Sequence, residues 1–377
     1  MSQKAKEAFA SLLNPSVSNV PEYIPGKTTS QIAAEYGLDP TSVIKLNANE
    51  NPFGPSPKVV KAIAEAANTA SLYPTADASN LRAALTKYTG FPVDNIVAAG
   101  PGMDSLIDAL NKLFIREGDE VILPAPTFTY YGISAAGLGG VPVYAGLKAD
   151  YAVDIDKILK AVTERTKIIF LCSPNNPTGN VIAAADVRRL AEQVNAIIFI
   201  DEAYVEFSEK GSLCGLVNEY ENIVIGRTFS KAFGLAGMRL GYALAPAWIA
   251  QNLLRVLPPF SVSILAETAA IAALEGSDDM TAGVKAVREE RKKLIVSVTE
   301  QTPYKAYPSE GNFIIVDVSP NTSKEAVDIF LKNGVAIRSC DSFLNIGKNT
   351  VRITIGTAEM NKKVMESFGI LKKNKKG

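Results

Sequence analysis

The sequence predicts an α/β protein with a large, doubly wound, mostly parallel sheet domain and a smaller α/β domain. Short β-prone runs recur along the first two thirds of the chain. Several are apolar at every position, which is typical of strands covered by helices on both faces. Helical patterns at 103–114 and 183–194 lie between some of these runs, and this alternation indicates a doubly wound sheet. The expected strands span 95–99, 120–123, 141–144, 167–171, 196–200, 222–225 and 240–244.

The pattern of expected helices and strands changes after about Ser261, and this change predicts the smaller domain. Helical patterns at 262–274 and 281–298 come first. The charged run 288–293 in the second pattern is expected to form a solvated helix face. The remaining expected elements are strands at 312–318, 335–339 and 350–355 and helices at 324–333 and 358–368.

We expect these elements to form three units. Residues 1–45 are rich in Pro and turns and too short to fold alone. They are expected to be an N-terminal arm or part of the small domain, packed on that domain or on a partner chain. Residues 46–280 form the expected large, cofactor-binding domain, and residues 281–377 form the expected small C-terminal domain.

Composition argues against several function classes. The 377 residues carry 39 basic and 39 acidic side chains, so no global field favours nucleic acid or a membrane. No apolar run reaches the roughly 20 residues that a membrane helix needs, and residues 1–13 lack a secretory core. Three cysteines without metal-like spacing fit a reducing cytosol. We therefore expect a cytoplasmic protein without a metal site.

The chain contains no histidine. This excludes His-based catalytic triads, HExxH zinc sites and imidazole acid–base catalysis. A proton shuttle at neutral pH must therefore use Lys, Asp, Glu, Tyr or Cys, and a lysine freed from an imine is a natural candidate.

The segment 228–239 carries the most informative chemistry. Lys231 follows Ser230, and Arg239 lies eight residues further on, with glycines between them. A hydroxyl and an arginine can hold a phosphate while the lysine amine forms an imine with an aldehyde. That combination suits pyridoxal phosphate. Taken alone, the segment could also be an ordinary glycine-containing turn with two solvated cations.

Two further segments place polar side chains directly after buried strands, where open α/β sheets bind ligands. Asp201 ends the apolar run 196–200 and can pair with a protonated pyridine nitrogen, although an aspartate there is also a common helix N-cap. Asn176 lies in the Pro- and Asn-rich loop 172–179 and can offer its amide to a ring oxygen. As a lone motif, this loop is a turn.

A third turn supplies candidate phosphate donors. The segment 100–104 opens a predicted helix after a strand, and backbone N–H groups of Gly102, Met103 and Asp104 can make an anion site there. A plain turn between strand and helix is the alternative. Phe128 can stack on a cofactor ring or serve as a core aromatic.

These motifs together resemble a known family. Ser-Pro-Asn-Asn-Pro-Thr-Gly at 173–179, Asp-Glu-Ala-Tyr at 201–204 and Thr-Phe-Ser-Lys-Ala-Phe-Gly-Leu-Ala-Gly-Met-Arg at 228–239 are similar, in order and spacing, to fold-type I, class I/II aminotransferases. Enzymes of this family depend on pyridoxal phosphate, so the resemblance implies the fold of the fold-type I pyridoxal-phosphate transferases.

Residues 46–54 and 351–357 narrow the likeness to histidinol-phosphate aminotransferases, and it extends from about Tyr23 to about Ile370. It implies transfer of the amino group of histidinol phosphate to 2-oxoglutarate, which gives imidazole acetol phosphate and glutamate in histidine biosynthesis. An aromatic amino-acid aminotransferase and a phosphoserine- or threonine-phosphate-handling relative remain alternatives. A non-enzymatic alternative is a regulatory protein that binds pyridoxal phosphate without turnover.

The resemblance also implies roles for the cofactor residues. Lys231 carries pyridoxal phosphate as an imine and, once freed, moves the proton between the substrate carbon and the cofactor. Asp201 pairs with the pyridine nitrogen, and Asn176 and Tyr204 donate to the phenolate oxygen. A free lysine has a pKa of about 10.4, and neighbouring cations such as Arg239 can lower it.

The cofactor phosphate is expected to bind Ser230, Arg239 and the turn at Asp104. The family's usual acid pair reads Asp104-Ser105 here, and a contact made by the backbone should survive that change. By resemblance, Tyr73 reaches the cofactor phosphate of a neighbouring subunit, which implies a homodimer with shared active sites.

Two arginines remain for the substrate. Arg352 lies inside an expected strand, where an unpaired buried charge is costly and an anionic ligand would resolve that cost. Arg338 ends another expected strand. By resemblance, Arg352 takes the α-carboxylate of glutamate or 2-oxoglutarate. Both arginines, with Tyr23, would take the phosphate of an amino-alcohol phosphate, and Asn176 is a further substrate-binding candidate. A surface ion pair is the alternative for either arginine.

Overall fold

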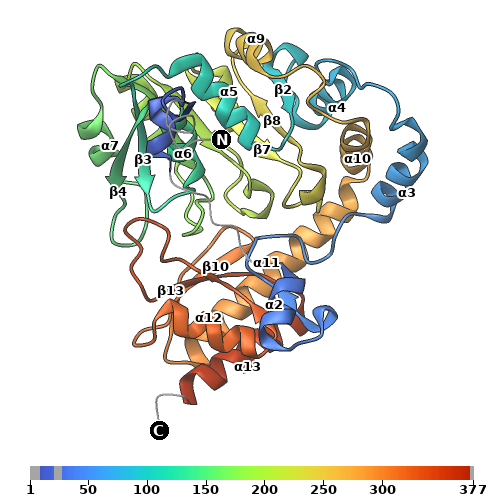
Figure 1. Ribbon diagram of the computed structural model, residues 1–377, viewed down its shortest axis with the longest axis vertical. Coiled ribbons are helices and arrows are strands. Elements are labelled where there is room, and N and C mark those ends of the chain that lie inside the picture. The colour runs from blue at the N-terminus through green and yellow to red at the C-terminus, as the bar shows by residue number, and fades with distance from the viewer. Residues whose placement is uncertain (1–8, 21–27, 374–377) are drawn as a thin grey trace.

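A seven-stranded sheet forms the centre of the larger domain in the computed structural model, which describes residues 9–20 and 28–373 (Figure 1). In spatial order its strands are β2 (Ile96–Ala99), β8 (Gly241–Leu244), β7 (Ile223–Thr228), β6 (Ile197–Asp201), β5 (Thr166–Cys172), β3 (Glu120–Ala125) and β4 (Val141–Gly146). Neighbouring strands are parallel except that β8 runs antiparallel to both β2 and β7. The predicted mostly parallel sheet is therefore confirmed, and each expected strand is present with slightly shifted ends.

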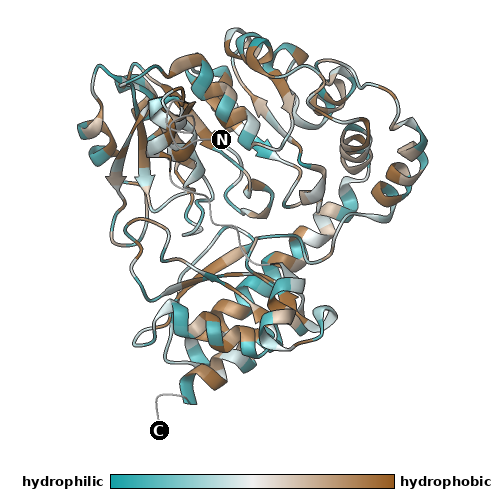
Figure 2. Ribbon diagram, in the orientation of Figure 1, coloured by the Kyte–Doolittle hydropathy of each residue, from teal (hydrophilic) through white to brown (hydrophobic). Residues whose placement is uncertain are grey.

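Helices cover both faces of this sheet. One face carries α5 (Asp104–Phe114), α6 (Tyr130–Gly137) and α9 (Ala247–Val256). The other face carries α3 (Pro57–Ala66), α4 (Ser79–Thr89), α7 (Ile155–Ala161), α8 (Ala184–Gln193) and α10 (Ile264–Glu275). Alternate strand residues point to opposite faces: Val97 belongs to the first core and Ile96 to the second. Figure 2 shows the resulting concentration of hydrophobic residues on the central strands.

A four-stranded antiparallel sheet and three helices form the smaller domain (Figure 1). The strands, in spatial order, are β12 (Arg338–Ser339), β13 (Thr350–Thr354), β10 (Phe313–Asp317) and β9 (Lys305–Ala306). The helices are α11 (Ser277–Gln301), α12 (Ser323–Lys332) and α13 (Ala358–Lys373).

The expectation of one continuous strand at 335–339 is wrong. Its first half, β11 (Val335–Ala336), pairs in parallel with β1 (Ile44–Lys45), whereas Arg338 and Ser339 pair with β13. The strand is broken because its two halves pair with different strands. The partner of the first half lies in the N-terminal segment, which the local residue pattern does not reveal.

Residues 28–45 of the N-terminal segment pack on the small domain, whereas η1 (Pro15–Asn19) lies against α6 of the large domain (Figure 1). The expected packing on the small domain therefore applies to only part of the described segment. Helix α2 (Thr29–Tyr36) begins with a capping box, in which Thr28 and Gln31 satisfy each other's backbone N–H groups. Ile32 of this helix is buried in the same apolar cluster as Leu331 of α12. Residues 28–45 are therefore held on the small domain both by β1 and by this helix.

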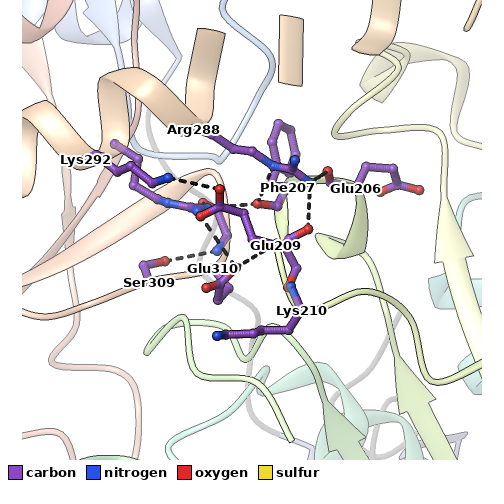
Figure 3. Close-up of polar contacts among 11 residues, drawn as sticks. Glu206, Phe207, Glu209, Lys210, Arg288, Lys292, Ser309 and Glu310 are labelled. Carbon is purple, nitrogen blue, oxygen red and sulfur yellow. Dashed lines mark hydrogen bonds and ion pairs between the residues drawn. The ribbon is translucent and has the colours of Figure 1, made fainter. Parts of the chain in front are cut away.

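The charged run of α11 is not simply a solvated face, which corrects the expectation from sequence. Glu289 and Lys293 are exposed, but Arg291 is buried. Arg288 donates to backbone carbonyls of residues 206–208 (Figure 3). One side of the run faces protein because α11 passes along the junction of the two domains. Neither α11 nor any other helix in the described ranges is long and apolar enough to cross a membrane.

Candidate active site

A cavity of about 350 Å³ lies where the carboxyl ends of β5, β6 and β7 face the small domain. Of the residues predicted for the site, Gly102 and Tyr73 do not line this cavity, and Tyr23 lies outside the described residues. The predicted residues that do line it are Met103, Asp104, Phe128, Asn176, Asp201, Tyr204, Ser230, Lys231, Arg239, Arg338 and Arg352.

The surroundings of Lys231 favour the uncharged form of its amine. Its Nζ donates to the carbonyl of Ala48 at 3.1 Å. The pKa of Lys231 is lowered to about 8, first because the amine is buried and then because Arg352 lies nearby, while Glu50 opposes the shift. Arg239, the cation expected to act on this amine, has a smaller effect than Arg352. A neutral, nucleophilic amine is therefore accessible near physiological pH.

Asp201 sits at the end of β6 as a buried, fully hydrogen-bonded carboxylate. Its Oδ1 accepts from the backbone N–H of Ala203 at 2.9 Å, and its Oδ2 accepts from the Tyr131 hydroxyl at 2.5 Å. Burial raises the pKa of Asp201 to about 6, and these two hydrogen bonds oppose that shift. The alternative of a helix N-cap is not what the structure shows, because Asp201 caps no helix. A buried carboxylate beside a cavity favours a cationic partner there.

Tyr131 is a residue of the site that the sequence did not indicate. It lies in α6 and is fully buried, and its ring stacks on Phe170 with 4.9 Å between centroids. The ring of Phe128, which lines the cavity, meets Tyr131 edge to face at 5.4 Å. The stacking fixes the direction of the hydroxyl, so that it can donate to Asp201 and stabilise the ionised carboxylate. The only available signal was its position three residues after Phe128.

Tyr204 and Asn176 present donors to the cavity. The Tyr204 hydroxyl accepts from Asn49 Nδ2 at 3.1 Å, so its own proton is directed elsewhere. Asn49 was not identified from sequence, although it belongs to the segment 46–54. Asn176 Oδ1 accepts from Arg352 Nη1 at 2.6 Å, which leaves the amide nitrogen as the donor end of that side chain. The two donors thus come from the loops that follow β5 and β6.

The polar groups expected to bind the cofactor phosphate lie together on the wall of the cavity. Helix α5 begins at Asp104, and the carboxylate of Asp104 lies 3.1 Å from Arg239 Nη2. Gly102 has a φ of +74°, a backbone conformation that favours glycine, and a Cβ there would approach Arg239 Nη2 to 2.8 Å. Ser230 Oγ accepts from Thr228 Oγ1 at 3.0 Å. These groups combine a hydroxyl, a guanidinium and the N-terminus of a helix.

Ser105 stands where the family is expected to have an acid. Its hydroxyl donates to the carbonyl of Gly102 at 2.7 Å, within the same turn. Burial raises the pKa of Asp104, and Arg239 opposes that shift.

Arg338 and Arg352 stand directly opposite each other on adjacent antiparallel strands. Their Cα atoms are register partners in the β12–β13 pair, so both side chains project on the same face of the sheet and line the cavity. Arg352 is buried and donates through Nη2 to the carbonyl of Asn47 at 2.8 Å. Arg338 is half-buried and lies 3.3 Å from Ser342 Oγ. Like charges opposite each other are unfavourable unless an anion lies between them.

Tyr73 lies on the surface rather than in the cavity of its own chain. Its side chain is 84% exposed, and its ring contacts Phe260 with 5.2 Å between centroids. Phe260 and Leu72 are also exposed. These apolar side chains form a patch on the large domain.

The donor set fits pyridoxal phosphate. A buried carboxylate at Asp201 suits a protonated ring nitrogen, and the amine of Lys231 has the lowered pKa that an aldehyde-binding lysine needs. The cluster around Ser230 and Arg239 suits a phosphate, and Phe128 offers an aromatic face. Each part of the cofactor thus has a chemically matched group on the cavity wall.

Comparison with known proteins agrees with this chemistry. A family model described as "Aminotransferase class I and II" matches residues 41–368. Histidinol-phosphate aminotransferase of Methanosarcina mazei is 51% identical over 96% of this chain and 97% of its own length. The Methanocaldococcus jannaschii protein of the same name is 39% identical over 91% of this chain and 93% of its own.

A solved structure has the same architecture. The crystal structure of histidinol-phosphate aminotransferase from Sinorhizobium meliloti, in complex with pyridoxal-5'-phosphate, superposes with a TM-score of 0.87. It is 26% identical to this chain, and the match covers 97% of this chain and 98% of that one.

We expect Lys231 to capture pyridoxal phosphate at a rate that rises through about pH 8 instead of near the usual lysine pKa of 10.5. Only the neutral amine attacks an aldehyde. Mixing cofactor-free protein with pyridoxal phosphate over a range of pH and following absorbance gives the profile. Borohydride should then fix the chromophore on the peptide containing Lys231. A profile that rises only above pH 10, or label on another lysine, contradicts this assignment.

In the cofactor-free protein, Asp201→Asn should remove a pH-dependent destabilisation. The folded-state pKa of about 6 exceeds the usual 3.8, so the stability contributed by this group is present at low pH and lost as pH rises through about 6. The variant should therefore gain stability relative to the wild type between pH 4 and 7, by up to about 3 kcal/mol. Urea unfolding at both pH values measures the difference, and a pH-independent difference would refute the raised pKa.

Proposed function

The chain belongs to the aminotransferase class I and II family, and we propose that it transfers the amino group of histidinol phosphate to 2-oxoglutarate. The products are imidazole acetol phosphate and glutamate, and the step belongs to histidine biosynthesis. The histidinol-phosphate aminotransferases that resemble it along nearly its whole length support this reaction. The observation that carries the proposal is the pair of opposed arginines, Arg338 and Arg352, over the cavity that contains Lys231.

Pyridoxal phosphate supplies, when bound, an electron sink that stabilises negative charge at the substrate α-carbon. We propose that Lys231 holds its aldehyde carbon and that Asp201 pairs with its ring nitrogen. Ser230, Arg239 and the N-terminus of α5, from Gly102 to Asp104, would hold its phosphate. Support comes from the matched donors and from the buried carboxylate described above.

Further residues belong to the proposed cofactor site. Asn176 and Tyr204 would donate to the ring oxygen, because the oxygen of each accepts from a protein donor, which leaves its N–H or O–H group to point elsewhere. Phe128 would cover one face of the ring. The Tyr131 hydroxyl would keep Asp201 ionised, which is the form that attracts a protonated ring nitrogen.

Lys231 is proposed to move the proton of the reaction. Its Nζ amine, when not bound to the cofactor, has a pKa of about 8 and can both accept and release a proton near neutral pH. The proton would leave the α-carbon of the amino substrate and return to the oxo acid in the second half of the cycle. The chain has no histidine to take this part.

One anion site would serve both substrates. Arg352 is proposed to bind the α-carboxylate of glutamate or 2-oxoglutarate, and Arg338 and Arg352 together, with Asn176, to bind the phosphate of histidinol phosphate. A phosphate carries more negative charge than a carboxylate and can accept from two guanidinium groups. The predicted contribution of Tyr23 falls outside the described residues and remains part of this proposal.

We further propose a homodimer with shared active sites and a cytoplasmic location. The exposed Tyr73, Leu72 and Phe260 form a surface suited to a second copy of the chain. Tyr73 would reach the cofactor phosphate of that copy. All three cysteines are free thiols, which fits a reducing compartment.

A substrate panel tests the reaction. Wild type should prefer histidinol phosphate to phenylalanine or tyrosine, and Arg338→Ala should lower kcat/KM for histidinol phosphate about ten- to a hundredfold, since a charge-assisted hydrogen bond is worth roughly 1.5–3 kcal/mol. The aromatic amino acids should be affected much less. Arg352→Ala should impair both half-reactions. If free aromatic amino acids are preferred and Arg338→Ala leaves the profile unchanged, the protein is an aromatic aminotransferase instead.

Tyr73→Phe tests the shared site. Loss of one hydroxyl from the phosphate-binding groups should weaken retention of pyridoxal phosphate while the thermal unfolding of the protein stays unchanged. Equilibrium dialysis measures cofactor retention, and sedimentation velocity measures assembly. A fully active monomer at the assay concentration contradicts the shared site.

A further inference from the structure

A buried cation of α11 joins the two domains beside the site. Arg291 is 2% exposed. Its Nη1 donates to the carbonyl of Phe207 in the large domain at 3.1 Å and to that of Gly311 in the small domain at 2.7 Å. Its Nη2 lies 3.9 Å from the carboxylate of Glu310. One guanidinium therefore connects two segments that are far apart in sequence.

Both of these segments lead directly to the site. Phe207 lies three residues after Tyr204, and Gly311 lies two residues before Phe313. The ring of Phe313 meets that of Tyr204 edge to face with 5.0 Å between centroids. The guanidinium of Arg352 lies 5.7 Å from the Phe313 ring centroid. Tyr204, Phe313 and Arg352 thus form a contact series across the domain junction, and Arg291 fixes the chain on both sides of it.

Glu310 ties the loop of Asn176 to the same junction. Its carboxylate accepts from the backbone N–H of Glu209 at 2.7 Å (Figure 3). Its own N–H donates to the carbonyl of Gly179 at 2.9 Å. A Cβ on Gly179 would lie 2.2 Å from Ser309 Oγ, so this loop is pressed directly against the small domain. The position of Asn176, which binds Arg352, is thereby set by the junction as well.

We propose that Arg291 is a positioning residue for substrate binding: it holds the small domain on the large domain so that Arg352 meets Asn176 and Tyr204 at one anion site. Only the identity of the substrates rests on the proposed function. The role of Arg291 follows from its contacts, since it touches backbone carbonyls and Glu310 and does not line the cavity.

The geometry explains why an arginine is needed at this position. A guanidinium has several donors in a rigid plane and can reach two carbonyls and a carboxylate at once, whereas a lysine ammonium is a compact point charge. An apolar side chain would leave the buried carbonyls of Phe207 and Gly311 without this donor. The domains would then lose a fixed spacing, and small misplacements of binding groups carry large penalties in catalysis.

Arg288 provides a matched control one helical turn away. Its side chain donates to the carbonyls of Glu206, Phe207 and Ser208 at 2.6–3.1 Å, all on the large-domain side (Figure 3). Loss of Arg288 therefore weakens the attachment of α11 to the same loop but leaves the bridge from Phe207 to Gly311 in place.

The test compares Arg291→Gln with Arg288→Gln in the holoenzyme. Arg291→Gln should raise KM for histidinol phosphate and for 2-oxoglutarate about ten- to a hundredfold, with a smaller change in kcat and unchanged cofactor retention. The dissociation constant of glutarate, a non-reacting dicarboxylate, measured by calorimetry should rise by a similar factor. Arg288→Gln should change these values by less than about threefold, and Arg291→Lys should give an intermediate result.

Several outcomes would overturn the proposal. A folded Arg291→Gln protein with unchanged KM and glutarate affinity would do so, and so would equal effects of the two glutamine variants, which would indicate general weakening of the helix. If Arg291→Gln does not fold, Arg291→Lys and Glu310→Gln decide, and wild-type values in both would count against it. A wild type without activity on histidinol phosphate contradicts the proposed function instead, and the glutarate measurement still tests Arg291.

Discussion

The hydrogen bond between Arg352 and Asn176 is the contact on which the site depends. It joins a strand of the small domain to the loop after β5 at 2.6 Å, across the cavity floor that both domains share. The same arginine is the strongest charged influence on the pKa of Lys231. A single guanidinium therefore belongs to the anion site, to the domain junction and to the environment of the reactive amine.

Burial acts on the two principal ionisable groups in opposite senses. It lowers the pKa of the Lys231 amine and raises that of the Asp201 carboxyl, because in each case it disfavours the charged form. The two values approach each other on either side of neutrality. Hydrogen bonds oppose the effect of burial at Asp201. Those from Tyr131 and Ala203 lower its pKa, because both favour the ionised form of the carboxyl.

Local sequence was sufficient for residues whose role follows from a strand end or a helix start. Asp201, Asn176 and Lys231 all follow strands of the central sheet, and a parallel sheet brings such ends to one edge. Sequence was not sufficient for residues defined by remote partners. The hydroxyl of Tyr131 finds its acceptor 70 residues away, and Asn49 finds Tyr204 at a separation of 155.

Other elements differ from the prediction either because they are short or because their partners are remote in sequence. Helices α6 and α7 have only 8 and 7 residues, too few for a clear helical period. The strand expected at 335–339 divides because each half has a different neighbour. The charge run of α11 was read as solvated, yet Arg291 finds its acceptors 84 and 20 residues away.

The two opposed arginines lie on the small domain, whereas Lys231, Asp201 and Ser230 lie on the large one. In the proposed roles, the two arginines that bind the substrate come from one domain and the amine that acts on the bond comes from the other. Changes at Arg352 would also alter the reactive amine, because Arg352 lowers the pKa of Lys231, whereas changes around Arg338 leave that influence in place. In evolutionary terms, Arg352 couples selectivity to chemistry, and an engineer seeking a new amino donor would begin with the residues around Arg338.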